Sequence, residues 1–508
     1  MKIKHILATI AMLPAAILSA EPVDVDYEAS LWVNASTGNL APYMMGSWRY
    51  GKIDGAYGIW QDGRLEKQLD TDRRFSWAAG VEYMAGTSSD ADYSLYDSMN
   101  RRWLIQTNRQ ASFRLHQLYG QVKYRSVYLL AGMKEQHSGI VDDTMSSGDL
   151  TRSNNARPIP GVAAGFIDFQ DIPFTNGWVQ IDGEIMYGRF FDGTMRDKIF
   201  NHYTGVVTDN MYYTYKRCYF RTKPSQPLSI TIGMQTGGLF GGTSRRYRQG
   251  ELVKTEVRGF HLRDLWDMFF PTEGGEDYYK GQSLGSWDFK ARYNFRDGSQ
   301  LTAYFEGPWE DGSGIGRMNG FDGLWGLQYN FAHCGWVSKV AVEYLDFVNQ
   351  SGPIHWAPGD NPGTDIINSA TGADDYYNNF YYGTYTNYGL SIGTPFLVSP
   401  LYNENGDPMY IHNRARGFHA AIAGNPSGQW SYSLKVSYQR AGGSGWVPAA
   451  RRLSDTSAMA TAVWTPNDNL KGLTVTLQAA FDAGKLRGNN FGAMIGLAYS
   501  GNFSLGKK

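Results

Sequence analysis

Apolar and polar residues alternate with a period of two along much of the chain. From Trp287 to Phe295 every second residue is apolar or aromatic. The polar residues between them are Asp288, Lys290, Arg292 and Asn294. Successive side chains of a β-strand point to opposite faces, so this period indicates strands with one apolar and one polar face. The same alternation recurs at residues 75–83, 179–187, 230–234, 325–331, 340–344, 430–438, 473–481 and 491–499.

The length and the chemistry of these segments predict a transmembrane barrel. Most are about nine or ten residues long, the length that a tilted strand needs to cross a bilayer. Charged residues on the polar face suit a water-filled lumen, and Trp and Tyr often stand at segment ends, where interfacial girdles lie. The charged positions are Asp182, Glu184, Lys290 and Arg292, and the aromatic ends are Trp287, Tyr344, Trp430 and Tyr438.

We therefore expect residues 21–508 to form an all-β, antiparallel transmembrane barrel. After residue 20 no apolar window of about 18–20 residues is available for a spanning helix. At roughly 25–30 residues per strand with its connection, the length allows about 16–18 strands. The alternating segment that starts at Phe491 is the expected closing strand. The alternative is a large soluble β-sandwich or propeller, but no repeat of blade length is evident.

Two segments depart from the alternation. Residues 94–117 carry several arginines without a steady period, and we expect a helix or a loop there. Residues 264–270 place Leu265, Trp266 and Phe269 at near-helical spacing, which predicts a short helix. Such helices would cap or plug one mouth of the barrel, and the alternative is an ordered extracellular loop.

The first twenty residues predict export. Lys2 and Lys4 precede an apolar stretch that begins at Ile6, and Ser19-Ala20 ends the segment. This is the layout of a secretory signal peptide, although Leu18 stands where a small residue is preferred. The competing interpretation is an N-terminal membrane anchor. Together with the predicted barrel, the signal peptide at residues 1–20 indicates the outer membrane.

Composition excludes several classes of protein. The chain has 508 residues, with 47 Lys and Arg against 48 Asp and Glu, which gives a net charge of −1. This balance excludes nucleic-acid binding driven by bulk positive charge. An aromatic content of 15% excludes a disordered chain. Two cysteines, Cys218 and Cys334, exclude a disulfide scaffold and a multi-cysteine zinc module, and their spacing leaves open whether they pair.

No catalytic signature is present. The sequence has no HExxH, GxSxG or GxxxxGK[ST] motif. The acidic pairs Glu310-Asp311 and Asp374-Asp375 lack the spacing of a calcium loop and suit a solvated loop better. His355 and His419 are the candidate bases of an outer-membrane hydrolase, but neither has a diagnostic partner nearby in the sequence. These observations favour a protein that is not an enzyme.

Residues 374–388 are dense in Tyr and Asn. Aromatic rings stack on the apolar faces of sugars, while Asn and Asp bond sugar hydroxyls, so the composition suits an uncharged polar glycan. The alternative is an aromatic girdle with loop packing, which explains the tyrosines as well but the adjacent asparagines less well.

Short motifs follow one another between about residues 130 and 440. They are Ser147-Gly-Asp-Leu, Arg152-Ser-Asn-Asn-Ala-Arg-Pro-Ile-Pro, Asp322-Gly-Leu-Trp-Gly-Leu, Glu343-Tyr-Leu-Asp-Phe-Val-Asn-Gln-Ser-Gly-Pro, Tyr376-Tyr-Asn-Asn, Ile392-Gly-Thr-Pro, Asn413-Arg and His419. In this order they resemble the capsule-assembly Wzi family of outer-membrane proteins, and the whole length fits. Thr394 and Phe396, on either side of Pro395, depart slightly from the family pattern.

The resemblance implies an outer-membrane barrel of 18 strands with a small helical element toward the periplasm. It also implies a lectin-like, non-enzymatic role in attaching or organising capsular or surface polysaccharide, with no metal or organic cofactor. The implied partners are outer-membrane lipid, the polysaccharide and the barrel-insertion machinery. The candidate glycan-binding residues are Trp325, Tyr344, Gln350, Tyr377, Asn378, Tyr382 and Asn387.

Two further expectations accompany these candidates. Trp325 and Tyr344 are strand positions, and we expect them to face lipid rather than sugar. The charged lumen face supports a different function, a porin for small polar solutes or sugars, and this is the alternative to polysaccharide attachment.

Overall fold

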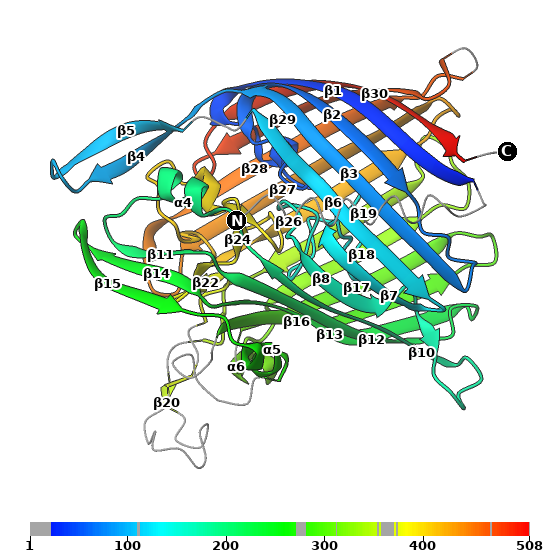
Figure 1. Ribbon diagram of the computed structural model, residues 1–508, viewed down its shortest axis with the longest axis horizontal. Helices are drawn as coiled ribbons and strands as arrows, with labels where there is room; N and C mark the ends of the chain where they lie inside the picture. Colours follow the sequence, from blue (N-terminus) through cyan, green and yellow to red (C-terminus); the bar gives the residue numbers. More distant parts are fainter. Residues whose placement is uncertain are drawn as a thin grey trace.

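The computed structural model describes residues 22–108, 112–270, 281–310, 312–352, 355–356, 370–371, 374–467 and 470–506. The expected signal peptide at residues 1–20 lies outside the described residues. Within them, antiparallel strands join into one continuous sheet that closes on itself (Figure 1).

The closed sheet is a barrel of 18 strands, counted over the described residues, in which β8 and β9 together form one strand because both pair with β10. Neighbours in the barrel are neighbours in the chain, and β30 pairs with β1 to close it. The strands are β1 (Val23–Leu40), β2 (Gly55–Lys67), β3 (Phe75–Ser88), β6 (Phe113–Tyr124), β7 (Val127–Met133), β8 (Gly161–Phe166), β9 (Gln170–Asp171), β10 (Val179–Arg189), β12 (Tyr212–Thr222), β13 (Leu228–Phe240), β16 (Gly281–Asn294), β17 (Gln300–Trp309), β18 (Gly323–Asn330), β19 (Lys339–Asp346), β26 (Ala415–Gly424), β27 (Trp430–Gly443), β28 (Pro448–Trp464), β29 (Leu473–Gly484) and β30 (Asn490–Leu505).

The alternating segments of the sequence are strands of this barrel, as predicted. On β16, Trp287 and Phe289 are exposed on the outer face, whereas Asp288 is buried on the inner face. Because the sheet closes on itself, none of its described strands has a free edge in the hydrocarbon layer. Unpaired backbone groups there would cost several kcal/mol each. The predicted closing strand at Phe491 is β30, and its pairing with β1 confirms that expectation.

The two ends of the barrel differ in the length of their connections. Residues 125–126 join β6 to β7, whereas residues 347–414 join β19 to β26. Short turns lie at the end that holds the start of β1 and the end of β30 (right in Figure 1). In transmembrane barrels the short turns are periplasmic and the long loops extracellular. We therefore call the other end the extracellular end.

Hairpins and short helices occupy the extracellular end. Its small sheets include the hairpin of β4 (Ala91–Asp97) with β5 (Arg102–Asn108), and β11 (Gly205–Asp209) with β14 (Gly242–Arg248) and β15 (Glu251–Arg258). The described helices are α3 (Tyr43–Gly46), α4 (Gly193–Ile199), α5 (Leu262–Phe269), α6 (Gly312–Ile315) and the 3-10 turn η1 (Pro400–Tyr402). Among the described residues, no helix has the length and apolar character needed to cross a membrane.

The structure confirms one helix prediction and corrects two other expectations. Helix α5 (Leu262–Phe269) contains all but the last residue of the predicted helix at 264–270. The described residues of the segment 94–117 are not helical: they contain most of the β4–β5 hairpin and the start of β6. Most of β5 is solvent-exposed on both faces because the hairpin projects from the barrel, so its sequence shows no alternation. The helices of the described residues lie in extracellular connections, not toward the periplasm, because the periplasmic turns are too short to hold them.

The core of the molecule lies inside the barrel. The connection between β7 and β8, residues 134–160, folds into the lumen, and we call it the inner segment. Residues 374–414, called the cover segment, pack against it. Tyr213, Tyr215 and Tyr219 of β12 are buried in one cluster with residues of both segments. The polar inner face that suited a water-filled lumen is therefore largely covered by the protein's own chain.

Candidate functional site

The inner segment is held by charged side chains of the barrel wall. The backbone N–H of Ser147 donates to Glu343 at 2.8 Å, and that of Leu150 donates to Glu306 at 2.8 Å. Arg152 donates to Glu184 at 2.7 Å and lies 3.5 Å above the centre of the Tyr215 ring. A buried carboxylate needs such partners because leaving it unpaired is costly.

Other lumenal charges also bind the inner segment. The Nζ atom of Lys290 donates to the carbonyl oxygen of Ile140 at 2.6 Å. Lys339 donates to Asp142 at 2.9 Å. Burial raises the pKa of Asp142, but hydrogen bonds from Thr144 and Lys339 and the charge of Lys339 outweigh burial and lower it to about 2. The structure confirms that the inner face of the barrel is charged. Many of these charged side chains bind the protein's own inner segment.

The cover segment is joined to the inner segment by its tyrosines and threonines. The Tyr377 hydroxyl donates to the carbonyl oxygen of Leu150 at 2.5 Å, and the Tyr385 hydroxyl to that of Thr151 at 3.0 Å. Thr394 donates to the carbonyl oxygen of Ser147 at 3.0 Å. The two segments therefore form one packed body inside the barrel.

Five of the predicted glycan-binding residues lie inside this packed body. Gln350, Tyr377, Asn378, Tyr382 and Asn387 are each at most 5% exposed. The amide N–H groups of three of them have internal partners: Asn378 donates to Tyr410 O, Asn387 to Arg157 O, and Gln350 to Phe347 O. In this conformation they are buried within the protein and do not form its surface.

The other two predicted residues lie on the outer face of the wall. Trp325 of β18 pairs across the sheet with Tyr344 of β19, and the inward position beside Tyr344 is Glu343. The Trp325 ring is 39% exposed and packs 4.1 Å from the Phe305 ring. The structure thus places both residues toward lipid, as the sequence led us to expect.

His419, one of the two candidate catalytic residues, is not in an exposed site. His419 is 1% exposed, its Nδ1 lies 2.7 Å from the Ser437 hydroxyl, and its Nε2 lies 3.1 Å from the carbonyl oxygen of Met145. His419 therefore ties the inner segment to the wall. The side chain of His355 lies outside the described residues.

The sequence predicts a solvated loop at Asp374 and Asp375, but in the structure both carboxylates are bound by other side chains of the protein. Asp374 is 5% exposed and accepts from Ser351 at 2.5 Å, while Asp375 accepts from Asn413. These bonds hold the carboxylates within the packed cover segment, which a sequence pattern of adjacent acids does not reveal.

A polar pocket opens at the extracellular mouth. Its volume is about 460 Å³, and it lies between the end of β1, the cover segment and the β29–β30 connection. Lys485, Asn489 and Glu404 are exposed in its lining, and the ring of Tyr402 is half-buried. The pocket thus offers a cation, an amide, a carboxylate and an aromatic ring to one ligand.

One histidine of the pocket has an unused ring nitrogen. Nδ1 of His412 is buried and has no hydrogen-bond partner among the described residues. Burial lowers the pKa of His412, so the ring is neutral near pH 7. Beside it in the pocket lining, Arg487 donates to the carbonyl oxygen of Phe396 at 2.7 Å and lies 4.0 Å above the Tyr43 ring. The arginine is fixed in place, whereas the buried histidine nitrogen has no partner of its own among the described residues.

An aromatic cluster stands next to the pocket. The rings of Tyr96, Trp103 and Tyr203 have centres 4.7–5.5 Å apart, and Trp103 is 48% exposed. We call these three residues the aromatic platform. Strand β4 connects it to the pocket, because Tyr93 lines the pocket and the N–H of Ser94 donates to the carbonyl oxygen of Glu404 at 2.7 Å. Sequence reasoning missed the platform because Tyr96 and Trp103 lie in the segment expected to be a helix or loop, and Tyr203 is far from both in the sequence.

Comparisons with known proteins identify the class of barrel. No family model and no curated protein sequence matches the chain. Among solved structures, it is similar to Wzi of Escherichia coli, described as an outer-membrane, carbohydrate-binding β-barrel involved in group 1 capsule assembly. The identity is 13%, the match covers 97% of this chain and 87% of Wzi, and the TM-score is 0.55. The chain is an outer-membrane β-barrel.

Channel-type barrels are also similar to this outer-membrane barrel. OccAB2 of Acinetobacter baumannii is 9% identical over 94% of this chain and 98% of its own, with a TM-score of 0.48. OprD of Pseudomonas aeruginosa is 7% identical over 96% of this chain and 98% of its own, with a TM-score of 0.44. At these identities the likeness concerns the fold.

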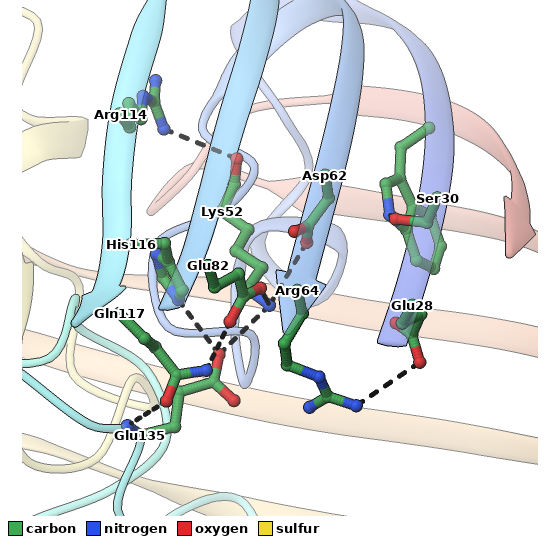
Figure 2. Close-up of polar contacts among 11 residues, drawn as sticks. Glu28, Ser30, Lys52, Asp62, Arg64, Glu82, Arg114, His116, Gln117 and Glu135 are labelled. Atoms are coloured by element: carbon green, nitrogen blue, oxygen red, sulfur yellow. Dashed lines mark hydrogen bonds and ion pairs between the residues drawn. The ribbon is translucent and has the colours of Figure 1, made fainter. Parts of the chain in front are cut away.

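A charged cluster on the inner wall of the outer-membrane barrel centres on Lys52 (Figure 2). Its Nζ lies 2.5 Å from Glu82 of β3, 3.1 Å from Glu135 and 3.5 Å from Asp62 of β2. Burial would lower the pKa of Lys52, but the carboxylates outweigh it and raise the pKa above its usual range. Lys52 thereby anchors the connection between β1 and β2, residues 41–54, inside the barrel.

The same cluster contains metal-type donors. Among the described residues, Glu82, His116 and Glu135 bring ligand atoms within 4.8 Å of one another. His116 Nε2 lies 3.0 Å from Glu135, and the ammonium group of Lys52 contacts both carboxylates. A positive charge is therefore already supplied by the protein at the place where a cation would bind.

Proposed function

We propose that this barrel binds a capsular or surface polysaccharide at its extracellular mouth and helps to attach or organise that polysaccharide at the cell surface, as a lectin-like protein without enzymatic activity. The observation that carries the proposal is the polar pocket beside the exposed aromatic platform, above a lumen occupied by the protein's own chain.

The pocket has the size and chemistry of a site for part of a sugar chain. Its volume of about 460 Å³ falls within the range of ligand pockets, roughly 300–1,000 Å³. Sugar hydroxyls both donate and accept, so they suit a lining that offers Lys485, Asn489 and Glu404. The neutral imidazole ring of His412, which also lines the pocket, adds polar character without a net charge.

The aromatic platform supplies the second contact of a carbohydrate site. A sugar ring has apolar C–H faces, which pack on aromatic rings. Trp103 is the exposed member, with Tyr96 and Tyr203 holding its ring from the side. A polymer that fills the pocket at one residue can lie on the platform at another, which favours a chain over a free monosaccharide.

The similarity to Wzi agrees with this proposal at the level of fold. In this proposal the seven candidate residues of the sequence are not the main contacts with the polysaccharide. Five of them are buried and two lie on the outer face of the wall, and we propose Trp103, His412, Lys485 and Asn489 as the contacts.

Binding of purified protein to capsular polysaccharide extracts tests the proposal. Trp103→Ala is expected to weaken binding roughly three- to tenfold, since an aromatic contact is worth about 0.5–1.5 kcal/mol beyond its area. Lys485→Ala is expected to weaken binding as well. Trp336→Ala and Lys471→Ala, in periplasmic turns, are the matched controls and should bind like the parent protein. Equal binding by all four variants would contradict the proposal.

A cellular measurement complements the binding assay. Cells that lack the protein should release polysaccharide into the medium while total synthesis continues. Cells complemented with the Trp103→Ala variant should release an intermediate amount. If the cell-bound polysaccharide is unchanged in the absence of the protein, a role in attachment is excluded.

A porin for small polar solutes or sugars is the second candidate function, supported by the charged inner face of the wall. Asp182, Glu184, Lys290 and Arg292 all belong to that face. Single-channel recording in planar bilayers separates the two functions. A barrel that keeps the inner segment in place is expected to show almost no ion conductance, whereas a steady conductance would favour the porin.

A further inference from the structure

Helix α5 lies on the outer face of the barrel wall (Figure 1). The Tyr187 hydroxyl of β10 donates to the carbonyl oxygen of Leu265 at 2.6 Å. The Nζ of Lys216 on β12 donates to the carbonyl oxygens of Met268 at 3.0 Å and Phe269 at 2.6 Å. Tyr187 and Lys216 point outward, because the residues beside them, Met186 and Arg217, face the lumen.

Two glycines on the outer face of the barrel make room for this helix. Met268 is 3% exposed and packs on two glycines of the wall, Gly238 of β13 and Gly281 of β16. A Cβ atom at Gly238 would lie 3.0 Å from the Met268 Cε, and one at Gly281 would lie 2.8 Å from its Sδ. Side chains at these positions would push the helix away, so the glycines form a shallow seat for α5.

The seat also explains a lysine on the outward face. An ammonium group exposed to hydrocarbon is costly, and lysines near a membrane normally extend toward polar groups. Lys216 instead meets the unpaired carbonyl oxygens at the C-terminus of α5, the negative end of the helix dipole. The lysine and the helix therefore stabilise each other on the outer wall.

The face of α5 that points away from the barrel is apolar. Leu262 is 80% exposed, Trp266 is 65% exposed and Phe270, just after the helix, is 47% exposed. These positions are four residues apart, so they form one stripe along the helix. Arg263 stands beside the stripe and is 83% exposed.

The stripe is continuous with the apolar belt of the barrel. Farther along the same strands, Phe220 of β12 and Ile232 of β13 are outward and exposed. Lys216, which marks the depth of α5, is four residues from the extracellular end of β12. Aromatic residues at that depth belong to the interfacial girdle of a membrane barrel.

We infer that α5 is an interfacial helix whose Leu262, Trp266 and Phe270 insert among the acyl chains of the outer leaflet. The occupant of this face is membrane lipid. The helix enlarges the apolar surface that contacts the outer leaflet on the side of β10–β16. Trp266 fixes the depth of the helix in the membrane. This role is independent of what the extracellular mouth binds.

Quenching by brominated lipid tests the inference. The folded protein and its Trp266→Phe variant are reconstituted into phosphatidylcholine vesicles with and without bromine near the headgroup end of the acyl chains. Subtracting the fluorescence emission spectrum of the variant from that of the parent protein gives the contribution of Trp266. We expect the emission of Trp266 to be blue-shifted and to be quenched in brominated vesicles, because the indole lies among the acyl chains.

Trp103→Phe is the matched control. Trp103 stands on the projecting hairpin, so its emission difference should be quenched by aqueous iodide and unaffected by bromine. If the Trp266 difference is quenched by iodide and not by brominated lipid, α5 does not contact the membrane. If neither quencher acts and the protein is dimeric by mass, the stripe meets a second copy and the inference is also overturned.

Discussion

Lys52 illustrates how single residues hold the interior of this barrel together. Its ammonium group faces three carboxylates from different parts of the chain, those of Asp62, Glu82 and Glu135. Glu82 is also the acceptor of Gln117, and Glu135 contacts His116. The lysine is therefore the positive centre of a network that connects three strands and two connections.

Replacing Lys52 by Met should destabilise the fold. The side chain keeps most of its length, but three carboxylates then face one another without a counter-charge. Breaking a largely buried ion pair in this way is expected to cost about 3 kcal/mol in the free energy of unfolding. Guanidinium unfolding in detergent micelles, followed by Trp fluorescence, measures it. Lys471→Met, in an exposed periplasmic turn, is the control, and an equal effect of both variants would contradict the prediction.

The same network predicts a dependence of stability on pH. Burial would raise the pKa of Glu135, but the hydrogen bond from His116 and the charge of Lys52 outweigh it and lower the pKa from 4.5 to about 2. A lowered pKa stabilises the folded state above the unfolded value, and this contribution is lost as the pH falls from about 4.5 through about 2.

Glu135→Gln removes this contribution. The unfolding free energy of the parent should therefore fall more steeply than that of the variant as the pH is lowered across this window. Parallel curves for the two proteins would exclude Glu135 as a source of the acid sensitivity.

The candidate site was only partly predictable at the level of residues. The sequence shows many Tyr and Asn residues at 374–388, but the partner of Asn387 is a carbonyl group 230 residues away. Whether such a residue meets a sugar or the protein depends on which strand faces it across the lumen. Trp103 stands among arginines without periodicity, so nothing local marked it as the exposed ring of a platform.

At the level of elements, alternation predicts a strand only where the two faces meet different surroundings. The wall strands separate lipid from a packed interior, and their period is clear in β16, β27 and β29. Strand β5 meets water on both sides and its period is lost. The inner segment has no regular structure, so no period could indicate that it enters the lumen.

The docking of the inner segment depends on one glycine. Gly148 has a φ of +111°, and a Cβ atom there would lie 2.8 Å from Cδ of Pro395 in the cover segment. Gly148→Ala should therefore destabilise the packed interior by about 2 kcal/mol, through backbone strain and this contact. Limited proteolysis and chemical unfolding report the effect. Gly120→Ala on β6, where a Cβ atom meets no neighbour within 4 Å, should be nearly neutral, and an equally mild Gly148→Ala would refute the prediction.

For the whole molecule, the interior segments determine whether solutes can pass. Replacing residues 141–156 by a short Gly-Ser linker should turn a nearly silent barrel into a conducting one. The carboxylates of Glu184, Glu306 and Glu343, which now bind the inner segment, would then face water and favour cations.

Planar-bilayer recording with ion-selectivity measurement tests this expectation. A variant that lacks the β4–β5 hairpin is the control and should remain silent, because that hairpin projects outside the lumen. A silent deletion variant would mean that the cover segment alone closes the barrel.

The contacts of the inner segment also have a consequence for the order of assembly. Glu306, Glu343 and His419, which bind it, follow their partners in the chain by 156, 196 and 274 residues. The segment is therefore synthesised long before the surfaces that receive it, and the seam between β1 and β30 forms only after all of them exist. The inner segment can therefore reach its final contacts only once the later strands of the barrel have been added around it.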